Sequence, residues 1–369
     1  KINKEHKEYT FTYQKLFSED DIGLELDKNL IQEKGEIDVI DKADSTSGTV
    51  KESLVTSSYH SLSRESKNYD AVIIEHCHEL FHDLRKAESL DYQELILSLD
   101  PEENKHSMLR IKESAGKSGS FFFFSKDNKF IIKTVKDHEL ETTLGVFMEN
   151  YYMNIMRNPD SLLTRIYGLY TIKINNITKI NIILMQNLSI IDRKFVRRVF
   201  DLKGSQVDRE TKRVEKADKM QALKEAEFQW MKQVYEEQNF IKFSFHQADI
   251  IDEALTKDLA MLQDCDLMDY SLLLIVIEIN DKDTTEHEML ESLFSQPRMI
   301  RRIFRSDCSP YVYCLGIIDY LQKYNLQKAI EHRIKKIIHD DRASAVDSKL
   351  YAFRLQKYVR KNVLDMKEY

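Results

Sequence analysis

The chain is poor in the residues that punctuate or cross-link small domains: its 369 residues include only 4 Cys, 9 Gly and 4 Pro. The four cysteines lie far apart with no CxxC pair, which argues against a disulfide scaffold and a thiolate zinc site and fits a reducing compartment. The scarcity of Gly and Pro disfavours a loop-rich sandwich and favours long regular elements. No apolar run approaches the roughly 18–20 residues that a membrane-spanning helix needs.

Positive charge is not in excess either. Lys and Arg number 55 against 62 Asp and Glu, a formal charge of −7, which excludes a nucleic-acid binder that depends on overall positive charge. The length suits two domains or lobes of about 100–200 residues each. Hydrophobic and charged shares of 42% and 32% are typical of a globular protein. The first residue is Lys1 rather than Met, which leaves an upstream membrane anchor open.

Residues 1–70 differ from the rest. The stretch 18–67 is acidic and rich in Ser and Thr, and its apolar residues are sparse. A segment of this composition cannot bury enough apolar surface to fold alone. We therefore expect a linker or partly disordered N-terminal segment over 1–70, and a compact unit that begins near Asp70.

From there the apolar residues recur with helical or strand periodicity. The spacing predicts helices over residues 71–87, 92–99, 138–156, 216–238, 247–263 and 349–363. Apolar or alternating runs predict strands over residues 120–125, 130–135, 165–174, 180–187, 195–202, 271–279 and 311–318. The sum is an α+β protein with a sheet-rich first lobe and a mixed second lobe.

Two short motifs suggest chemistry that their context does not support. Residues 78–82 read HELFH, which on a buried helix face would bind zinc through two imidazoles. However, His78 and His82 point almost opposite the apolar stripe of the predicted helix, which favours a solvated face. The GKS at 116–118 lacks the P-loop glycine, because Ile111 occupies that position, and it opens a strand rather than a helix.

The same small-residue turn has a better interpretation. Residues 116–120 lead into a predicted hairpin whose second strand carries Lys133. Kinases use such a turn to cover the phosphates of ATP and a strand lysine to reach the α- and β-phosphates. A surface hairpin with an extended lysine would have the same local pattern, so the motif alone is weak.

Three further residues at strand ends suit phosphate chemistry. Lys203 lies in DLKGS at 201–205, after a strand with many basic residues, where it could contact phosphate oxygens. Asp269 precedes one apolar strand and Asp319 ends another, and a carboxylate there can hold Mg²⁺ or accept a hydroxyl proton. A plain turn or a cap would explain each of them equally well.

In order, the segments GKSGSFFFFS, FIIKTV, DLKGS, DLMDYSLL and GIID closely resemble those of the phosphatidylinositol phosphate kinases. SLLTRIYGLY at 161–170 and MQNL at 185–188 are also similar, and the resemblance extends from about Ala71 to the end. It implies a two-lobed lipid-kinase fold distantly like protein kinases, with antiparallel sheets flanked by helices. The first lobe would span 71–187 and the second 188–369, with ATP in the cleft between them.

The resemblance also implies the roles of individual residues. Lys133 would pair with ATP phosphates, and Asp319 would hold Mg²⁺. Asp269 would be the catalytic aspartate near the attacking inositol hydroxyl, and Lys203 would touch the transferred phosphate or the lipid headgroup. The remaining ATP-binding positions would be Gly116, Lys117, Ser118, Gly119, Ser120, Met185, Asn187 and Leu188.

Substrate choice in this family is associated with the activation loop, here about 320–351. Its Glu331 lies in Ile-Glu-His, which resembles the Leu-Glu-His of type I enzymes and favours a phosphatidylinositol 4-phosphate 5-kinase. Of the two lysines usual before this glutamate only Lys328 is kept, with Ala329 in place of the other. The other activation-loop residues expected to meet the lipid are Arg333, Lys335 and Lys336.

We therefore expect an ATP- and Mg²⁺-dependent enzyme that makes phosphatidylinositol 4,5-bisphosphate, peripheral at the cytoplasmic face of an anionic membrane, with no nucleic-acid partner. A homodimer formed through the first lobe stays open. One alternative is a different regiospecificity, as a 5-phosphate 4-kinase or a 3-phosphate 5-kinase. Another is a catalytically weak phosphoinositide-binding module. A protein-directed kinase is disfavoured, because the chain has no His-Arg-Asp and no Asp-Phe-Gly motif.

Overall fold

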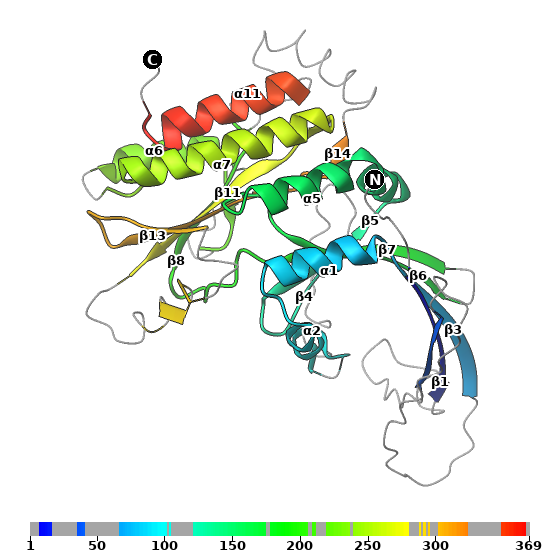
Figure 1. The fold of residues 1–369 in the computed structure, drawn as a ribbon. Helices are drawn as coiled ribbons and strands as arrows, with labels where there is room; N and C mark the ends of the chain where they lie inside the picture. Colours follow the sequence, from blue (N-terminus) through cyan, green and yellow to red (C-terminus); the bar gives the residue numbers. More distant parts are fainter. Residues whose placement is uncertain are drawn as a thin grey trace.

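The computed structural model shows a mixed α+β fold with two main sheets (Figure 1). The described residues are 7–16, 35–40, 66–101, 103–104, 121–174, 178–205, 209–211, 219–236, 239–279, 288, 291–292, 294–295, 302–323 and 348–366. No helix in these ranges is long and apolar enough to cross a bilayer.

The first sheet has seven strands in the order β2-β1-β3-β6-β7-β5-β4, and neighbouring strands are antiparallel. The strands are β1 (Lys7–Leu16), β2 (Gly35–Ile40), β3 (Ser66–Glu75), β4 (Phe122–Phe124), β5 (Phe130–Val135), β6 (Ile166–Ile174) and β7 (Thr178–Gln186). Ser125, in the turn between β4 and β5, donates to Asp127 and accepts from the amide of Phe130. These hydrogen bonds pair polar groups of the turn and fix the register of the hairpin.

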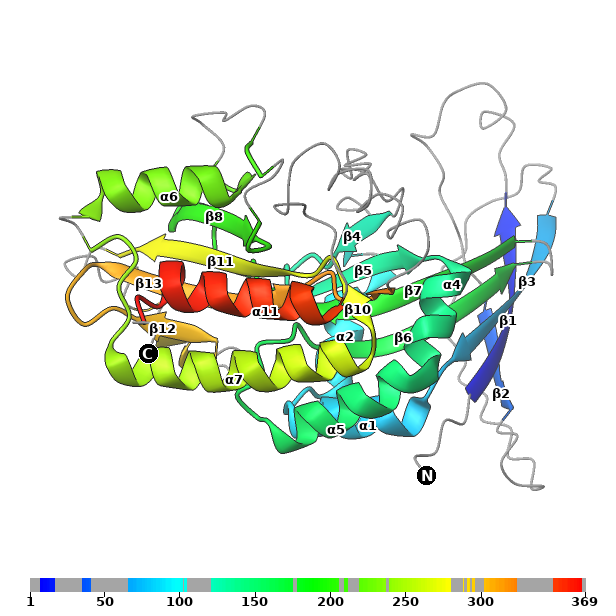
Figure 2. The same cartoon turned by 90° about the horizontal axis from the view of Figure 1, so that it is seen from above.

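Helices cover both faces of this sheet, because one group clusters with Ile183 and the other with the adjacent strand residue Leu184. They are α1 (His78–Ala87), α2 (Tyr92–Leu99), and the nearly continuous run α4 (Asp137–Thr142), η2 (Thr143–Phe147) and α5 (Met148–Arg157). Leu80, Phe81 and Leu84 of α1 recur at helical spacing and are buried. In Figure 2, α1 and α5 lie side by side, and the two helices are in contact.

The second sheet has the order β12-β13-β11-β8-β9, antiparallel except for β8 and β9. Its strands are β8 (Val196–Leu202), β9 (Ala222–Leu223), β11 (Ser271–Glu278), β12 (Ile303–Arg305) and β13 (Tyr311–Ile318). A separate two-stranded ladder joins β10 (Leu267–Met268) to β14 (Gln322–Lys323). The helices are α6 (Glu225–Val234), α7 (Phe245–Asp264) and α11 (Ser348–Tyr358), the last continued by η4 (Val359–Val363). Figures 1 and 2 show α7 and α11 side by side over β11 and β13.

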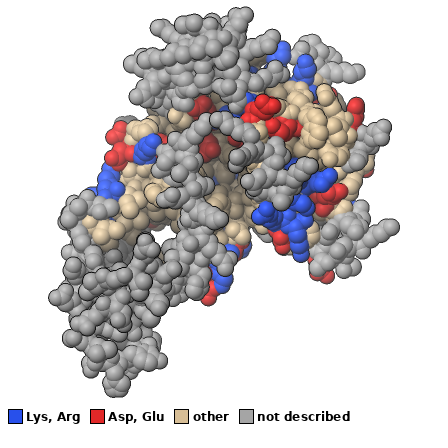
Figure 3. Space-filling model, turned by 180° about the vertical axis from the view of Figure 1, so that it is seen from behind, with Lys and Arg blue, Asp and Glu red and all other residues tan. Residues whose placement is uncertain are grey.

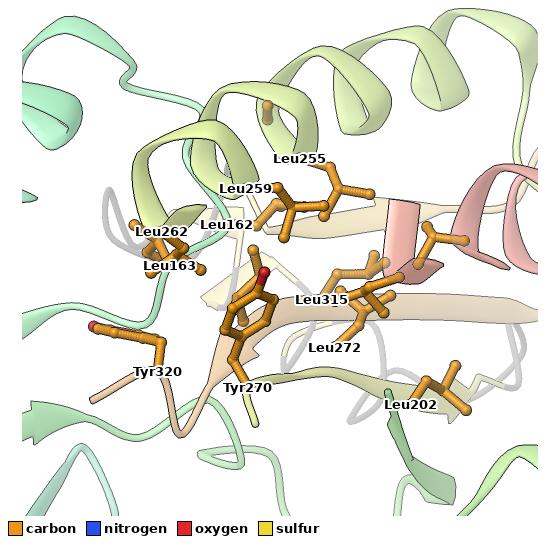
Figure 4. Close-up of a cluster of buried hydrophobic side chains, with 14 of the residues drawn as sticks. Leu162, Leu163, Leu202, Leu255, Leu259, Leu262, Tyr270, Leu272, Leu315 and Tyr320 are labelled. Carbon is orange, nitrogen blue, oxygen red and sulfur yellow. The ribbon is translucent and has the colours of Figure 1, made fainter. Parts of the chain in front are cut away.

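The main core lies between α7 and the second sheet. Leu255, Leu259 and Leu262 of α7 point toward strand residues such as Leu272 and Leu315 (Figure 4). The connecting segment 161–165 enters the same core, because Leu163 forms a bridge to Ile317 on β13. Burial of these side chains is the main stabilising term, at about 25 cal/mol per Å² of apolar surface. The same core holds the ends of β11 and β13 in place.

Two helices expected from the sequence differ from those in the fold. The helix expected over residues 71–87 begins only at His78, because 71–75 belong to β3 and pair with β1 and β6. A short apolar run is compatible with both helical and strand periodicity. Residues 71–75 form a strand because they pair with β1 and β6. The helix expected over 216–238 is shorter, at Glu225–Val234, and the short strand β9 precedes it.

Parts of the N-terminal segment, for which we expected a linker or partial disorder, form strands. Residues 7–16, 35–40 and 66–70 belong to strands, and β1 pairs with both β2 and β3. The alternation of Tyr9, Phe11 and Tyr13 with polar residues is the period-two pattern of a strand, which the acidic composition of the surrounding stretch obscured. The domain boundaries given above stay predictions.

Candidate active site

Lys133 and Asp319, 186 residues apart, form an ion pair between the two parts of the fold. Lys133 lies on β5 opposite Phe122 and Ile183, and its Nζ is 3.1 Å from Oδ1 of Asp319, the residue after β13. The Lys133 side chain is 15% exposed and that of Asp319 59%. The ammonium also lies 5.2 Å from the centre of the Phe122 ring. The structure therefore brings together two of the residues that the sequence singled out.

Asp269 is held beside Asp319 by strand pairing. Ser271 pairs with Ile318 in the second sheet, and Met268 pairs with Gln322 in the small ladder. Asp269 lies in the gap between these two pairs on one chain segment, and Asp319 lies in the same gap on the other. Both have positive φ, 65° and 59°, a conformation that Asp tolerates better than most residues. Each aspartate therefore interrupts its strand at the same point.

Lys203 reaches this edge of the sheet from β8. Leu202 pairs with Leu272, so Lys203 lies one residue beyond that pair, where β11 begins. The backbone N–H of Lys203 donates to Oε1 of the buried Glu225 at 2.5 Å. The other oxygen of Glu225 accepts from Nε of Arg209 at 2.6 Å. Because β8 and β13 both run antiparallel to β11, Lys203, Asp269 and Asp319 all lie at one end of the sheet.

Helix α11 forms hydrogen bonds to the segments that carry Asp269 and Lys203. The Tyr351 hydroxyl donates to the carbonyl of Tyr270 at 2.5 Å, and Arg354 Nη2 donates to the carbonyl of Lys203 at 3.4 Å. Burial raises the pKa of the Tyr351 phenol well above its usual range, so the hydroxyl stays a donor. No pattern in the sequence singles out Tyr351, Arg354 or Glu225. Their importance comes from contacts across more than 20 residues of sequence, which no local pattern signals.

A buried polar network supports β13 just before Asp319. The amide of Ile317 donates to the carbonyl of Leu162, and Thr164 Oγ1 donates to the carbonyl of Ile317 at 2.6 Å. The hydroxyl of Tyr320, the residue after Asp319, donates to the carbonyl of Thr164. These bonds fix the end of β13 from both sides.

Buried charges flank the same segment. Arg165 Nε is 2.7 Å from Oε1 of Glu88, and Arg302 donates to the carbonyl oxygens of Ser161 and Leu163. Burial and the nearby Arg165 charge lower the pKa of Arg302 to about 10. The Glu88 carboxylate thus stabilises two buried guanidinium groups, those of Arg165 and Arg302. Removal of this carboxylate would leave both positive charges uncompensated in the interior.

The residues expected to meet adenine lie at the end of β7, and two of them are buried. Asn187 donates through Nδ2 to the carbonyl of Asn128 at 2.7 Å and accepts from the amide of Ser189. Leu188 packs in a smaller core cluster of the second sheet. Met185 is partly buried, at the edge of the main core. The ATP role of all three stays a prediction.

Several other predicted site residues lie outside the described residues. These are Gly116, Lys117, Ser118, Gly119 and Ser120 of the phosphate loop, and Lys328, Glu331, Arg333, Lys335 and Lys336 of the activation loop. Their roles stay predictions.

The HELFH motif lies on α1, away from this cluster. The Nδ1 atom of His78 is 2.8 Å from Oε2 of Glu75, and the two histidine side chains differ in exposure, 19% for His78 and 61% for His82. Together with Arg85 and Tyr170 they line a cavity of about 640 Å³. Across the described ranges, no group of three or more His, Cys, Asp or Glu side chains is placed to hold a metal ion.

The described surface seen from behind carries charges of both signs. Figure 3 shows Lys and Arg side chains interspersed with Asp and Glu on this face. Oppositely charged side chains also pair among the described residues, for example Arg197 with Glu278 at 3.4 Å. On this view, the described residues do not form an extended face of one sign.

Comparison with known proteins identifies the family. The family model described as Phosphatidylinositol-4-phosphate 5-Kinase matches residues 103–302 and 298–362, well over half of the chain. The chain belongs to this family. The matched segments of this phosphatidylinositol-4-phosphate 5-kinase family member contain Lys133, Lys203, Asp269 and Asp319, as well as Arg354 on α11.

Curated relatives agree with the family match. The chain is 26% identical over 358 residues to phosphatidylinositol 4-phosphate 5-kinase its3 of Schizosaccharomyces pombe, covering 80% of this chain and 46% of the relative. It is 28% identical to phosphatidylinositol 4-phosphate 5-kinase 5 of Arabidopsis thaliana, covering 79% and 42%. It is 29% identical to the human type-1 alpha phosphatidylinositol 4-phosphate 5-kinase, covering 67% and 48%. The family member thus spans less than half the length of each of these relatives.

Proposed function

We propose that this chain is the catalytic unit of a lipid kinase that transfers the γ-phosphoryl group of ATP to the 5-hydroxyl of phosphatidylinositol 4-phosphate, with phosphatidylinositol 4,5-bisphosphate as the product. The ion pair between Lys133 and Asp319 is the observation that carries the proposal. A lysine on one sheet and an aspartate that follows a strand of the other lie 3.1 Å apart, and kinases use a lysine to hold the phosphates of ATP and an aspartate to hold Mg²⁺.

In this proposal the two sheets belong to the two lobes of a kinase, and ATP binds where Lys133 meets Asp319. The Lys133 ammonium exchanges Asp319 for the α- and β-phosphates when the nucleotide enters. Its partly buried position favours this role, because a charge shielded from water interacts more strongly with phosphate. The turn 116–120 covers the phosphates, and residues 185–188 border the adenine.

The carboxylates fit a magnesium ion. Mg²⁺ prefers oxygen ligands and is usually bound by one or two carboxylates together with substrate phosphates. Asp319 offers a well-exposed carboxylate next to the Lys133 ammonium, and Asp269 lies in the same gap of the strand ladder. Asp319 would hold the ion, which when bound would neutralise charge on the phosphates of ATP.

Asp269 and Lys203 have the remaining roles in the proposed phosphoryl transfer. Asp269 orients the inositol 5-hydroxyl and accepts its proton as the oxygen attacks the γ-phosphorus, the bond from that phosphorus to the β,γ-bridging oxygen breaks, and ADP leaves. Lys203, at the same end of the sheet, holds the transferred phosphate or the headgroup phosphate of the lipid. Phosphoryl transfer depends mainly on positioning and charge neutralisation, and two carboxylates and two lysines suit both tasks.

The relatives and the sequence support the proposed substrate and location. The relatives named above are phosphatidylinositol 4-phosphate 5-kinases, and Glu331 is the residue expected in the type I branch. We propose that the enzyme works as a peripheral protein on the cytoplasmic face of anionic membranes. Lys328, Arg333, Lys335 and Lys336 would contact lipid, each basic residue contributing about 1 kcal/mol near such a surface.

The test is transfer of labelled phosphate from ATP to vesicles that contain each phosphatidylinositol monophosphate in turn, followed by headgroup analysis. We expect transfer to the 4-phosphate lipid, and a fall of about 100-fold or more in kcat for Lys133→Met and for Asp319→Asn. Lys129→Met is the matched control, because Lys129 precedes β5 and pairs with Glu94 at 3.0 Å, and it should retain activity.

Three results would change the proposal. Normal turnover in either site variant would refute the assigned roles. A 4-hydroxyl product, or a preference for the 3-phosphate lipid, would leave a lipid kinase of different regiospecificity. Vesicle flotation by the wild-type protein without any phosphate transfer would favour the phosphoinositide-binding module.

A further inference from the structure

Helix α11 presents one face to the segments that carry the proposed catalytic groups. Tyr351, Arg354, Leu355 and Tyr358 recur at spacings of three, four and seven, and so share that face. Tyr351, Leu355 and Tyr358 are buried, and Arg354 is half-buried. Arg354 is therefore a cation in an otherwise apolar and aromatic stripe, a costly placement unless its charge is used.

The guanidinium of Arg354 meets the turn that carries Lys203. Its Nη2 donates to the carbonyl of Lys203 at 3.4 Å. The next residue, Gly204, lies so close to the helix that a Cβ there would be 2.9 Å from Cα of Leu355 and 3.0 Å from the carbonyl oxygen of Arg354. The turn therefore rests directly on the backbone of α11, with the arginine at its side.

The same side chain is coupled to the segment that carries Asp269. Arg354 lies over the ring of Tyr351, 4.7 Å from its centre, and the Tyr351 hydroxyl holds the carbonyl of Tyr270. The Tyr270 and Tyr351 rings pack edge to face at 4.8 Å. Burial lowers the pKa of Arg354, while Tyr351, Glu225 and Asp269 raise it, so the carboxylate of Asp269 is within electrostatic reach.

We infer that Arg354 is a positioning residue, which ties the Lys203 turn to the Asp269 segment so that both face the same phosphoryl group. This inference rests on the proposed function and adds a residue that acts through the others without touching substrate. Its planar, multiply donating guanidinium suits the task, because it can bond a carbonyl and keep its charge near a carboxylate. A misplacement of about 1 Å at a reacting group can cost about 100-fold in rate.

The experiment compares Arg354→Met, Arg354→Lys and Arg360→Met in the full chain. Met keeps most of the aliphatic length of arginine without its charge. Lys keeps the charge without the planar guanidinium and its several N–H donors. Arg360 is the matched control, because it continues the same helix into η4 and forms a two-point ion pair with Asp252 at 2.6 and 2.9 Å. Loss of the Arg360 pair should affect stability without moving Lys203 or Asp269.

The first readout is steady-state phosphate transfer to phosphatidylinositol 4-phosphate vesicles. We expect kcat to fall about 10- to 100-fold in Arg354→Met with the KM for ATP within about 2-fold. Arg354→Lys should recover part of the loss, and Arg360→Met should match the wild type. Equal kcat per folded molecule in Arg354→Met and Arg360→Met would overturn the inference, as would equal kcat in Arg354→Lys and wild type if Arg354→Met does not fold.

The second readout does not need activity. Backbone hydrogen exchange should quicken in peptides that span 201–205 and 268–272 in Arg354→Met, and stay unchanged there in Arg360→Met. Unchanged exchange in both segments of Arg354→Met would refute the positioning role. If the wild-type protein transfers no phosphate to any lipid, the proposed function fails, and hydrogen exchange alone then decides whether Arg354 ties the two segments together.

Discussion

Replacement of Gly204 by alanine tests how tightly the DLKGS turn is seated on α11. Gly204 has φ +70°, in the left-handed region that L residues avoid. An added Cβ would lie 2.9 Å from Leu355 Cα, 3.0 Å from the carbonyl oxygen of Arg354 and 3.1 Å from Tyr358 Cβ. These neighbours are backbone atoms or lie next to the backbone, so no rotamer change can make room.

Two costs then add. The left-handed conformation costs an L residue about 1–2 kcal/mol, and overpacking a well-packed site costs about 1–3 kcal/mol. Gly204→Ala should therefore lower the free energy of unfolding by about 2–5 kcal/mol, a large share of the roughly 5–15 kcal/mol of a typical domain. Because the turn carries Lys203, transfer activity should fall as well.

The assay is urea denaturation, with the midpoint and slope compared to the wild type. Gly204→Asn separates the two costs, because Asn tolerates positive φ better but keeps the Cβ. We expect Asn to lose less than Ala and still at least about 1 kcal/mol. If both variants unfold within about 0.5 kcal/mol of the wild type, the turn does not rest on the helix as described.

Two further predictions concern buried charges. Glu88→Gln should cost about 3–5 kcal/mol of unfolding free energy, because it leaves the guanidinium of Arg165 without its carboxylate. Asp83→Asn, at an exposed side chain of α1, is the control in the same denaturation assay, and equal losses in the two variants would contradict this. For Asp258, burial raises the pKa of the carboxyl above 3.8 although it accepts hydrogen bonds, including one from the amide of Leu162 at 2.6 Å. The proton binds the folded state more tightly, so this stabilising contribution is full below about pH 3.8 and is lost as the pH rises through the raised pKa. Unfolding measured from about pH 4 to about pH 8 should show this loss in the wild type relative to Asp258→Asn, and parallel curves would contradict it.

Secondary structure is predictable from the sequence where the spacing of apolar residues fits only one of helix and strand. The runs at 271–279 and 311–318 are almost wholly apolar and became the central strands β11 and β13. The helix expected at 92–99 has the same bounds as α2, whose N-cap Asp91 accepts from the amide of Gln93. The prediction failed at 71–75, where a short apolar run fits two periods and pairing with β1 and β6 decided the outcome.

The candidate site shows the same division. The residues that can carry the chemistry are visible in the linear pattern, as a lysine on a strand and aspartates at strand ends. Chain folding alone brings Lys133 and Asp319 to within 3.1 Å of each other and places the Lys203 turn against α11 through Arg354 and Gly204. Local patterns record the preference of a segment for helix or strand, whereas contacts between distant segments arise from packing that minimises exposed apolar surface over the whole chain.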